Sequence, residues 1–168
     1  MNRKTRYLTQ GAVIAALYVA LTFLANELGL ASQVIQVRFS EALTILPLFT
    51  PAAIPGVTIG CALANLLTGA AVWDVIFGPV ATLLGALGTR YLAQKHHILA
   101  PVFPILANAV IVPFILMYAY GSPDSYWFMF ATVGAGEIIS CGLLGFLLYK
   151  VVTKTNIFSS DMKSIKAR

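Results

Sequence analysis

Residues 8–24 read LTQGAVIAALYVALTFL, an apolar run that contains no charged residue. A run of this length is typical of a helix that crosses a lipid bilayer. It is too long for the apolar core of a signal peptide, and no convincing cleavage site follows it. We therefore expect a first membrane-spanning helix over about residues 7–28.

The remainder of the chain has the same apolar character. Of the 168 residues of the whole chain, 59% are hydrophobic and only 10% are charged, whereas a soluble domain carries about 25% charged residues. This composition predicts an all-α integral membrane protein that forms one domain over residues 1–168. The net charge of +5 does not indicate nucleic-acid binding, because the basic residues gather near the two ends of the chain.

The basic ends also predict a topology. Positive residues before the first helix and after the last place both termini in the cytoplasm, so the number of spans is even. Six spans with short loops fit the length, whereas four would leave apolar sequence unplaced. Prolines and turn-rich stretches such as GSPDSYW mark the boundaries. The expected spans of this six-helix bundle are about 7–28, 39–49, 55–67, 73–93, 101–120 and 126–152.

Four ionisable residues interrupt the apolar segments. Arg38 and Glu41 lie in VRFSEALTILP, Asp74 lies in AVWDVIFGP, and Glu137 lies in VGAGEIISCG. An ionisable group at the centre of a membrane helix costs roughly 2.5–3.5 kcal/mol, and such groups are kept where they pair, line a wet cavity or hold a polar ligand. These residues are therefore the first candidates for a functional site.

Polar residues from separate spans are expected to meet at one depth, in the outer half of the membrane. The residues at this level are Arg38, Glu41, Asn65, Asp74, Glu137 and, nearer the middle, Asn108. Arg38 and Glu41 share a helix face, so one interpretation is a mutual ion pair at the membrane rim. Two acids would then lack a cation, so they are either protonated or completed by a donor-rich ligand. The pattern favours a pocket open to the outside, although the two asparagines also suit contacts between helices.

The aromatic residues and the cysteines can each be explained by a structural role. Phe77 and Trp127 lie near the same outer level, where aromatic residues often form the interfacial belt, but a planar ligand would also stack on them. Cys61 and Cys141 are expected to be small buried side chains. No metal-ligating set is expected.

A stripe of small residues marks the first helix. Ala12, Ala16 and Ala20 recur at four-residue spacing, and such spacing lets another helix approach closely. One interpretation is ordinary packing within the bundle, and the other is a docking face for a partner membrane protein.

Three stretches together resemble the QueT family. They are IQVRFSEALTILPLFTPAAIPGVTIGCALANLL (35–67), DVIFGPVATLLGA (74–86) and GAGEIISC (134–141). QueT proteins are substrate-binding subunits, called S components, of energy-coupling factor (ECF) transporters, and are associated with queuosine precursors. The resemblance implies a six-helix bundle in the bacterial plasma membrane with an external ligand pocket. It also implies a transmembrane coupling subunit, which docks on the alanine stripe, and two ATPase subunits that carry ATP and Mg²⁺.

The ligand implied by the resemblance is a 7-deazaguanine, such as the 7-aminomethyl precursor or queuine. Its guanine-like edge presents two donors that a carboxylate binds in a bidentate manner, and an ammonium on its side chain would need a second carboxylate. We expect Glu41 and Glu137 to be the main ligand carboxylates, with Asp74 third. Asn65 and Asn108 are candidates for the base edge, and Arg38 either positions Glu41 or binds a ligand carbonyl.

No nucleotide-hydrolysing or other catalytic motif occurs in the chain, so we expect no enzyme activity and no cofactor on this chain. Two other functions are compatible with buried acids. The first is a stand-alone ion- or proton-coupled carrier of a small polar or cationic solute. The second is a structural subunit whose polar groups only join helices.

Overall fold

The computed structural model describes residues 2–155 and 157–158, and these residues form helices and connecting loops without a strand. The predicted all-α class is therefore confirmed. The elements in chain order are α1 (Arg3–Glu27), η1 (Leu30–Ser32), η2 (Phe39–Leu48), α2 (Ala53–Leu67), α3 (Val72–Leu92), η3 (His97–Leu99), α4 (Val102–Ala119), α5 (Tyr126–Glu137), η4 (Ile138–Leu144) and α6 (Gly145–Thr155).

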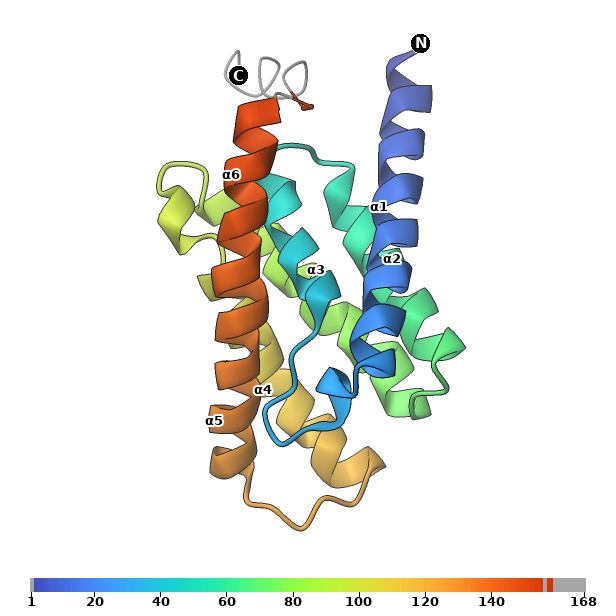
Figure 1. Cartoon of the computed structure of the whole chain (residues 1–168), viewed down its shortest axis with the longest axis vertical. Helices are drawn as coiled ribbons and strands as arrows, with labels where there is room; N and C mark the ends of the chain where they lie inside the picture. The colour runs from blue at the N-terminus through green and yellow to red at the C-terminus, as the bar shows by residue number, and fades with distance from the viewer. Residues whose placement is uncertain (1, 156, 159–168) are drawn as a thin grey trace.

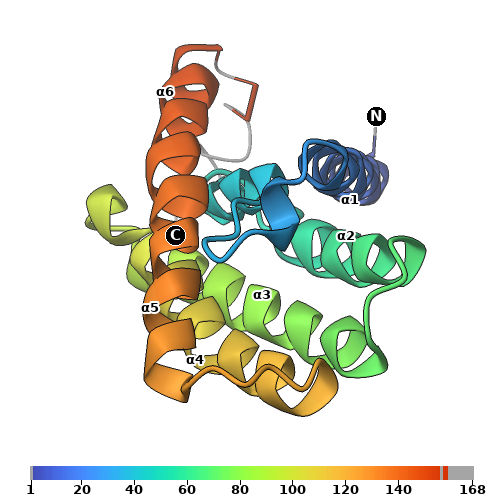
Figure 2. The ribbon, with the colours of Figure 1, turned by 60° about the horizontal axis from the view of Figure 1, so that its bottom comes forward.

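The helices run up and down the long axis of the molecule, so the start of α1 and the end of α6 lie at the same end (Figure 1). Consecutive helices pack side by side from α1 to α5, and Figure 2 shows them following one another around an arc. The short helix η2 packs against α1, α2, α3, η4 and α6. It is therefore the central element, and its side chains meet those of nearly every other helix.

Helix η2 is a 3₁₀ helix in the segment expected as the short second span. Every residue from Ser40 to Leu48 is buried. Long 3₁₀ helices are uncommon because their hydrogen bonds are poorly aligned, so packing from all sides must stabilise this one. Arg90 of α3 also donates a hydrogen bond to the carbonyl of Pro47 at 3.0 Å, which satisfies an acceptor near the end of η2.

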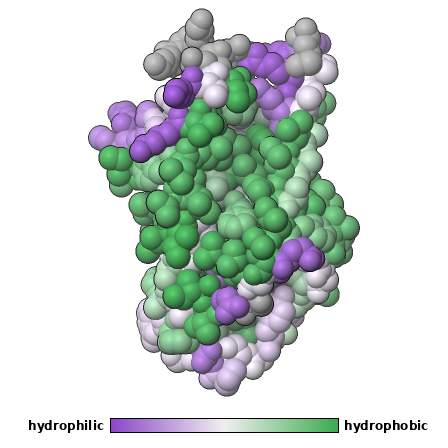
Figure 3. All heavy atoms as spheres, viewed as in Figure 1, coloured by the Kyte–Doolittle hydropathy of each residue, from purple (hydrophilic) through white to green (hydrophobic). Residues whose placement is uncertain are grey.

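Four helical stretches are long and apolar enough to cross a membrane. They are Arg3–Glu27, Val72–Leu92, His97–Ala119 and Tyr126–Thr155, and the last joins α5, η4 and α6. Phe39–Leu48 and Ala53–Leu67 are apolar but shorter. Figure 3 shows a hydrophobic band across the molecule, with hydrophilic residues gathered at the end where α1 begins. The chain is thus a membrane protein, while the six-span arrangement stays a prediction.

Helix α1 carries two neighbouring rows of small residues with different surroundings. Gly11 and Ala15 face α2, where a side-chain carbon added to Gly60 would lie only 3.1 Å from the Cα of Ala15. Small residues therefore let α1 and α2 pack closely. The residues Ala12, Ala16 and Ala20 are exposed instead, so packing inside the bundle does not account for them.

Candidate functional site

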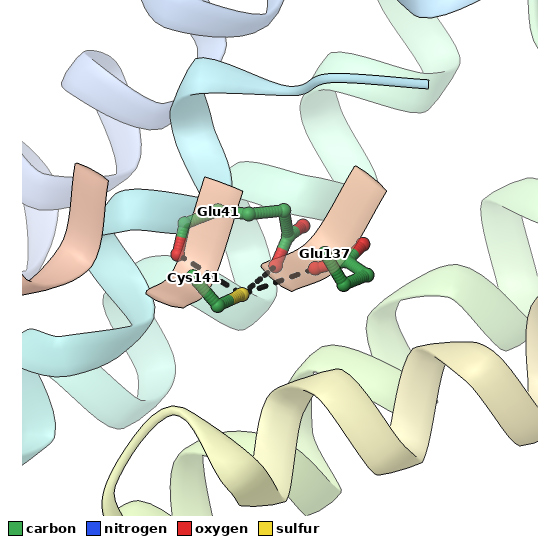
Figure 4. A group of neighbouring side chains, drawn as sticks. All are labelled: Glu41, Glu137 and Cys141. Atoms are coloured by element: carbon green, nitrogen blue, oxygen red, sulfur yellow. Dashed lines mark hydrogen bonds between the residues drawn. The ribbon is translucent and has the colours of Figure 1, made fainter. Parts of the chain in front are cut away.

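Two buried carboxylates meet at the centre of the bundle. Glu41 of η2 is 2% exposed, and Glu137 at the end of α5 is 8% exposed. Figure 4 shows Cys141 pointing toward both of them, and its thiol donates to Glu137 Oε2 at 3.0 Å and to Glu41 Oε2 at 3.9 Å. Asn108 of α4 donates to Glu41 Oε2 at 3.5 Å and also interacts with Glu137. The thiol and the amide therefore bridge the two acids.

The other oxygen of Glu41 is bound from α1. The phenol of Tyr18 donates to Glu41 Oε1, and the Tyr18 side chain is only 2% exposed. One turn further along α1, the hydroxyl of Thr22 contacts the hydroxyl of Ser40 at 2.9 Å. Two successive inward-facing residues of α1 thus orient the first turn of η2, and with it the carboxylate of Glu41.

The helix changes its winding directly after Glu137. Residues Ile138–Leu144 form a π-helix between α5 and α6. Such segments are rare and often occur at functional sites. Because a π turn contains more residues than an α turn, it changes the direction in which the following side chains point. Ser140 and Cys141 lie in this segment and are both buried, and Cys141 contacts the acids.

The loop before η2 is fixed against this helix. Ser140 accepts a hydrogen bond from the backbone N–H of Arg38 at 3.0 Å. A Cβ at Gly136 would lie 2.0 Å from the carbonyl oxygen of Gln36, so only glycine permits the loop to approach so closely. The residue immediately before Glu137 therefore positions the loop that leads to Glu41.

Asp74 forms a second polar group at the start of α3. Asn65 of α2 donates to the Asp74 carbonyl at 2.9 Å and to its carboxylate at 3.4 Å. Tyr120 donates to Asp74 Oδ2 at 3.3 Å and accepts a hydrogen bond from the Ala71 N–H at 3.0 Å. A Cβ at Gly78 would lie 2.7 Å from the amide nitrogen of Asn65. Asp74 thus takes its side-chain hydrogen bonds from Asn65 and Tyr120 and belongs to a group of its own.

Arg38 is a cation that interacts with both polar groups. Its guanidinium interacts electrostatically with both Asp74 and Glu41, and it donates a hydrogen bond to the side-chain amide oxygen of Gln36 (Oε1) at 3.4 Å. Glu41 takes its hydrogen bonds from Tyr18, Asn108 and Cys141 instead. The pairing of Arg38 with Glu41 therefore stays a prediction, and Arg38 also interacts with Asp74.

The aromatic candidates lie outside this cluster. Trp127 is 74% exposed and contacts Tyr126 and Phe130. It precedes Glu137 by ten residues on one helix, which is about 15 Å along the axis. Phe77 is 41% exposed and stacks on Trp73, with ring centroids 5.7 Å apart, in a groove between α3 and α4. The interfacial interpretation fits both residues better than stacking on a ligand held by the acids.

The central cluster also contains a group of residues that could hold a metal ion. Ligand atoms of Glu41, Glu137 and Cys141 all lie within 4.8 Å of one another. The sequence predicts no metal-ligating set, and it predicts Cys141 only as a small buried side chain. The structure corrects that interpretation of the thiol, because its sulfur donates to the carboxylates.

Three residues in contact with the acids were missed in the sequence: Tyr18, Tyr120 and Cys141. Cys141 follows Glu137 by four residues, a spacing that places two side chains on one helix face, so this contact could have been predicted from the sequence. Tyr18 had a weaker signal, since a buried phenol in an apolar helix needs a partner. No sequence pattern indicated the role of Tyr120, because its partners lie far along the chain, at the start of α3.

The sequence profile of the QueT transporter family matches residues 8–154. The chain belongs to the QueT transporter family. This match covers all four of the long apolar helices almost completely, and it includes every residue of both polar groups described above. Membership in a family of transporters agrees with the expectation that the chain is not an enzyme.

A curated relative within the QueT family is the Queuosine precursor transporter QueT of Lactococcus lactis subsp. cremoris (strain MG1363). It is 40% identical over 81 residues, which are 48% of this chain and 47% of the relative. The match thus spans about half the length of that protein. No solved structure matches the chain.

Proposed function

We propose that this QueT family member is the membrane-embedded substrate-binding subunit, or S component, of an ECF-type ABC transporter. Its substrate would be a queuosine precursor, a 7-deazaguanine such as 7-aminomethyl-7-deazaguanine or queuine. The observation that carries the proposal is the buried pair Glu41 and Glu137, bridged by Asn108 and Cys141. The Lactococcus relative is named as a queuosine precursor transporter, which supports the choice of substrate.

The charges of the site suit a cationic, donor-rich ligand. Three buried carboxylates (Glu41, Asp74 and Glu137) accompany one arginine, Arg38. Like charges as close as Glu41 and Glu137 repel one another strongly in a medium of low dielectric constant. A ligand that brings an ammonium group and two adjacent N–H donors would relieve this repulsion, and charge-assisted hydrogen bonds of this kind are roughly twice as strong as neutral ones.

The contacts of each acid suggest how the roles divide. Glu41 has one oxygen bound by Tyr18 and the other approached by Asn108 and Cys141. Glu137 accepts mainly from Cys141, so it has more capacity left for a ligand. Glu137 would therefore bind the base edge, with Glu41 as the second carboxylate and Asn108 as the amide between them. Asn65 and Asp74 are hydrogen-bonded to each other, so they would contribute less to ligand binding than the two glutamates.

Energy for uptake would come from other chains. Ala12, Ala16 and Ala20 present an exposed strip on α1, and close approach of small residues is a common basis of helix association in membranes. A transmembrane coupling subunit would dock on this strip, and two ATPase subunits would bind ATP and Mg²⁺. No cofactor is required on this chain, and nucleic acid is not among its partners.

Ligand binding to the purified chain tests the proposal. Thermal unfolding is measured with 7-aminomethyl-7-deazaguanine, queuine, guanine and an unrelated vitamin. We expect stabilisation by the deazaguanines, and Glu137→Gln should weaken their binding by about 10- to 100-fold, as for the loss of a hydrogen bond to a charged group. Glu27→Gln is the matched control, because Glu27 is an exposed acid at the end of α1. The proposal would be refuted if none of the deazaguanines stabilised the chain.

A stand-alone carrier is the alternative that the close pair of acids also permits, since buried acids serve as proton relays. Liposomes that contain only this chain distinguish the two functions. Uptake driven by a pH gradient, without ATPase subunits, would favour the carrier.

A further inference from the structure

A basic hollow lies at the end of the molecule where α1 begins. Its volume is about 660 Å³, and its lining includes Arg3, Lys4 and Arg6 beside Gln10 and Thr50. Lys4 is exposed and Arg6 is half-buried. Among the described residues that line the hollow there are three cations and no acid, so the hollow is complementary to an anion.

An apolar groove of about 490 Å³ continues from this hollow along α1 and α2. Tyr7 and Leu8 line both the hollow and the groove, which makes the two spaces neighbours. Further along, the groove is bounded by small residues of α1 such as Ala12 and by Ile59 and Leu63 of α2. The groove is therefore lined by apolar and small residues and the hollow by basic and polar ones, and hydrophilic residues gather at the end of the molecule where α1 begins (Figure 3).

We propose that the hollow and the groove together form a binding site for one anionic phospholipid. The headgroup phosphate would contact Arg3, Lys4 and Arg6, and one acyl chain would follow the groove between α1 and α2. Basic residues next to a membrane helix attract anionic headgroups, and guanidinium groups bind phosphate oxygens in a bidentate manner. A polar hollow alone would take any anion, and an apolar groove alone would take any acyl chain. Their junction at Tyr7 and Leu8 specifies a molecule that has both parts.

The same groove includes Ala12 and Ala16, which belong to the strip proposed above for docking. The lipid would therefore occupy the α1 face in the solitary subunit and would have to leave when a partner helix arrives. This inference needs neither the substrate nor the acid cluster, so it stands or fails separately from the proposed function.

The test uses the purified full chain in neutral detergent with added dioleoyl phosphatidylglycerol or dioleoyl phosphatidylcholine. Retained lipid is counted by native mass spectrometry, and thermal unfolding is measured in parallel. We expect one phosphatidylglycerol to be retained in preference to phosphatidylcholine. The double variant K4Q/R6Q should lower that affinity about tenfold or more. The matched control K150Q/K154Q removes two exposed lysines from α6 and should keep the preference.

Three results would overturn the proposal. The first is equal retention of the two lipids by the unmodified chain. The second is an equal loss in K4Q/R6Q and K150Q/K154Q, which would show a general charge effect. The third is full stabilisation by glycerol phosphate, which lacks acyl chains and would leave the groove without a role. The variant Ala16→Phe, which fills the groove, should reduce lipid retention, and unchanged retention in this variant would also contradict the site.

Discussion

Tyr18 of α1 donates its phenolic hydrogen bond to Oε1 of Glu41, across 23 positions of sequence. The contact is fully enclosed, since Tyr18 and Glu41 are each 2% exposed. It leaves Oε2 as the oxygen that faces Asn108 and Cys141. One phenol therefore fixes the orientation of the Glu41 carboxylate, so that its second oxygen faces the centre of the site.

Tyr18→Phe removes only the hydroxyl group and should weaken deazaguanine binding by about tenfold, because Glu41 loses its orienting donor. The check is a double-mutant cycle with Glu41→Gln, with the dissociation constant as the readout. A positioning role requires that Tyr18→Phe has little further effect once Glu41 is replaced, whereas independent effects that simply add would contradict it. Tyr91→Phe, at a residue that is 71% exposed, is the matched control.

Gly136→Ala should destabilise the fold by about 1–3 kcal/mol, as overpacking commonly does. The new methyl group would lie 2.0 Å from the Gln36 carbonyl oxygen and would displace the loop before η2. Gly134→Ala is a close control, since its Cβ would lie 3.8 Å from the nearest atom, on Ala109. Chemical unfolding of both variants measures the difference. Equal stability of the two would show that the loop does not depend on Gly136.

Cys141 should become inaccessible to a small thiol reagent when ligand is bound, because its sulfur lies between Glu41 and Glu137. The rate of methylthiolation is measured by mass spectrometry in the Cys61→Ala variant, in which Cys141 is the one remaining cysteine. We expect slow labelling of the free protein and at least about tenfold slower labelling with saturating ligand, as for a buried thiol that a ligand covers. Labelling at the same rate in both states would place the ligand elsewhere.

Ala16→Leu should abolish uptake in cells and leave deazaguanine binding to the purified chain unchanged, because Ala16 is exposed on the outer side of α1, away from the acids. A bulky side chain there would prevent close helix approach. Uptake and dissociation constant are measured on the same variant. Ala131→Leu, which enlarges an exposed alanine of α5, controls for a general effect of an added apolar group. Parallel loss of binding and uptake in Ala16→Leu would remove support for docking.

The sequence by itself determined the class of protein and the order of its helices. Apolar runs, basic ends and prolines predicted helical segments that the structure contains in the same order. It also singled out Glu41, Asp74 and Glu137, because an ionisable group in an apolar segment carries a cost that must be met by some partner. These signals are local, since they depend on composition and on spacing within one segment.

Only the tertiary structure decided how those residues are grouped. Glu41 meets Tyr18, Asn108 and Cys141, which come from three other helices, while Asp74 meets Asn65 and Tyr120 in a separate group. Spacing along a chain describes neighbours on one helix, but contacts between helices depend on how each helix is rotated about its axis. The 3₁₀ winding of η2 and the π winding of η4 alter that rotation, and η2 is buried from Ser40 to Leu48 by the helices packed around it.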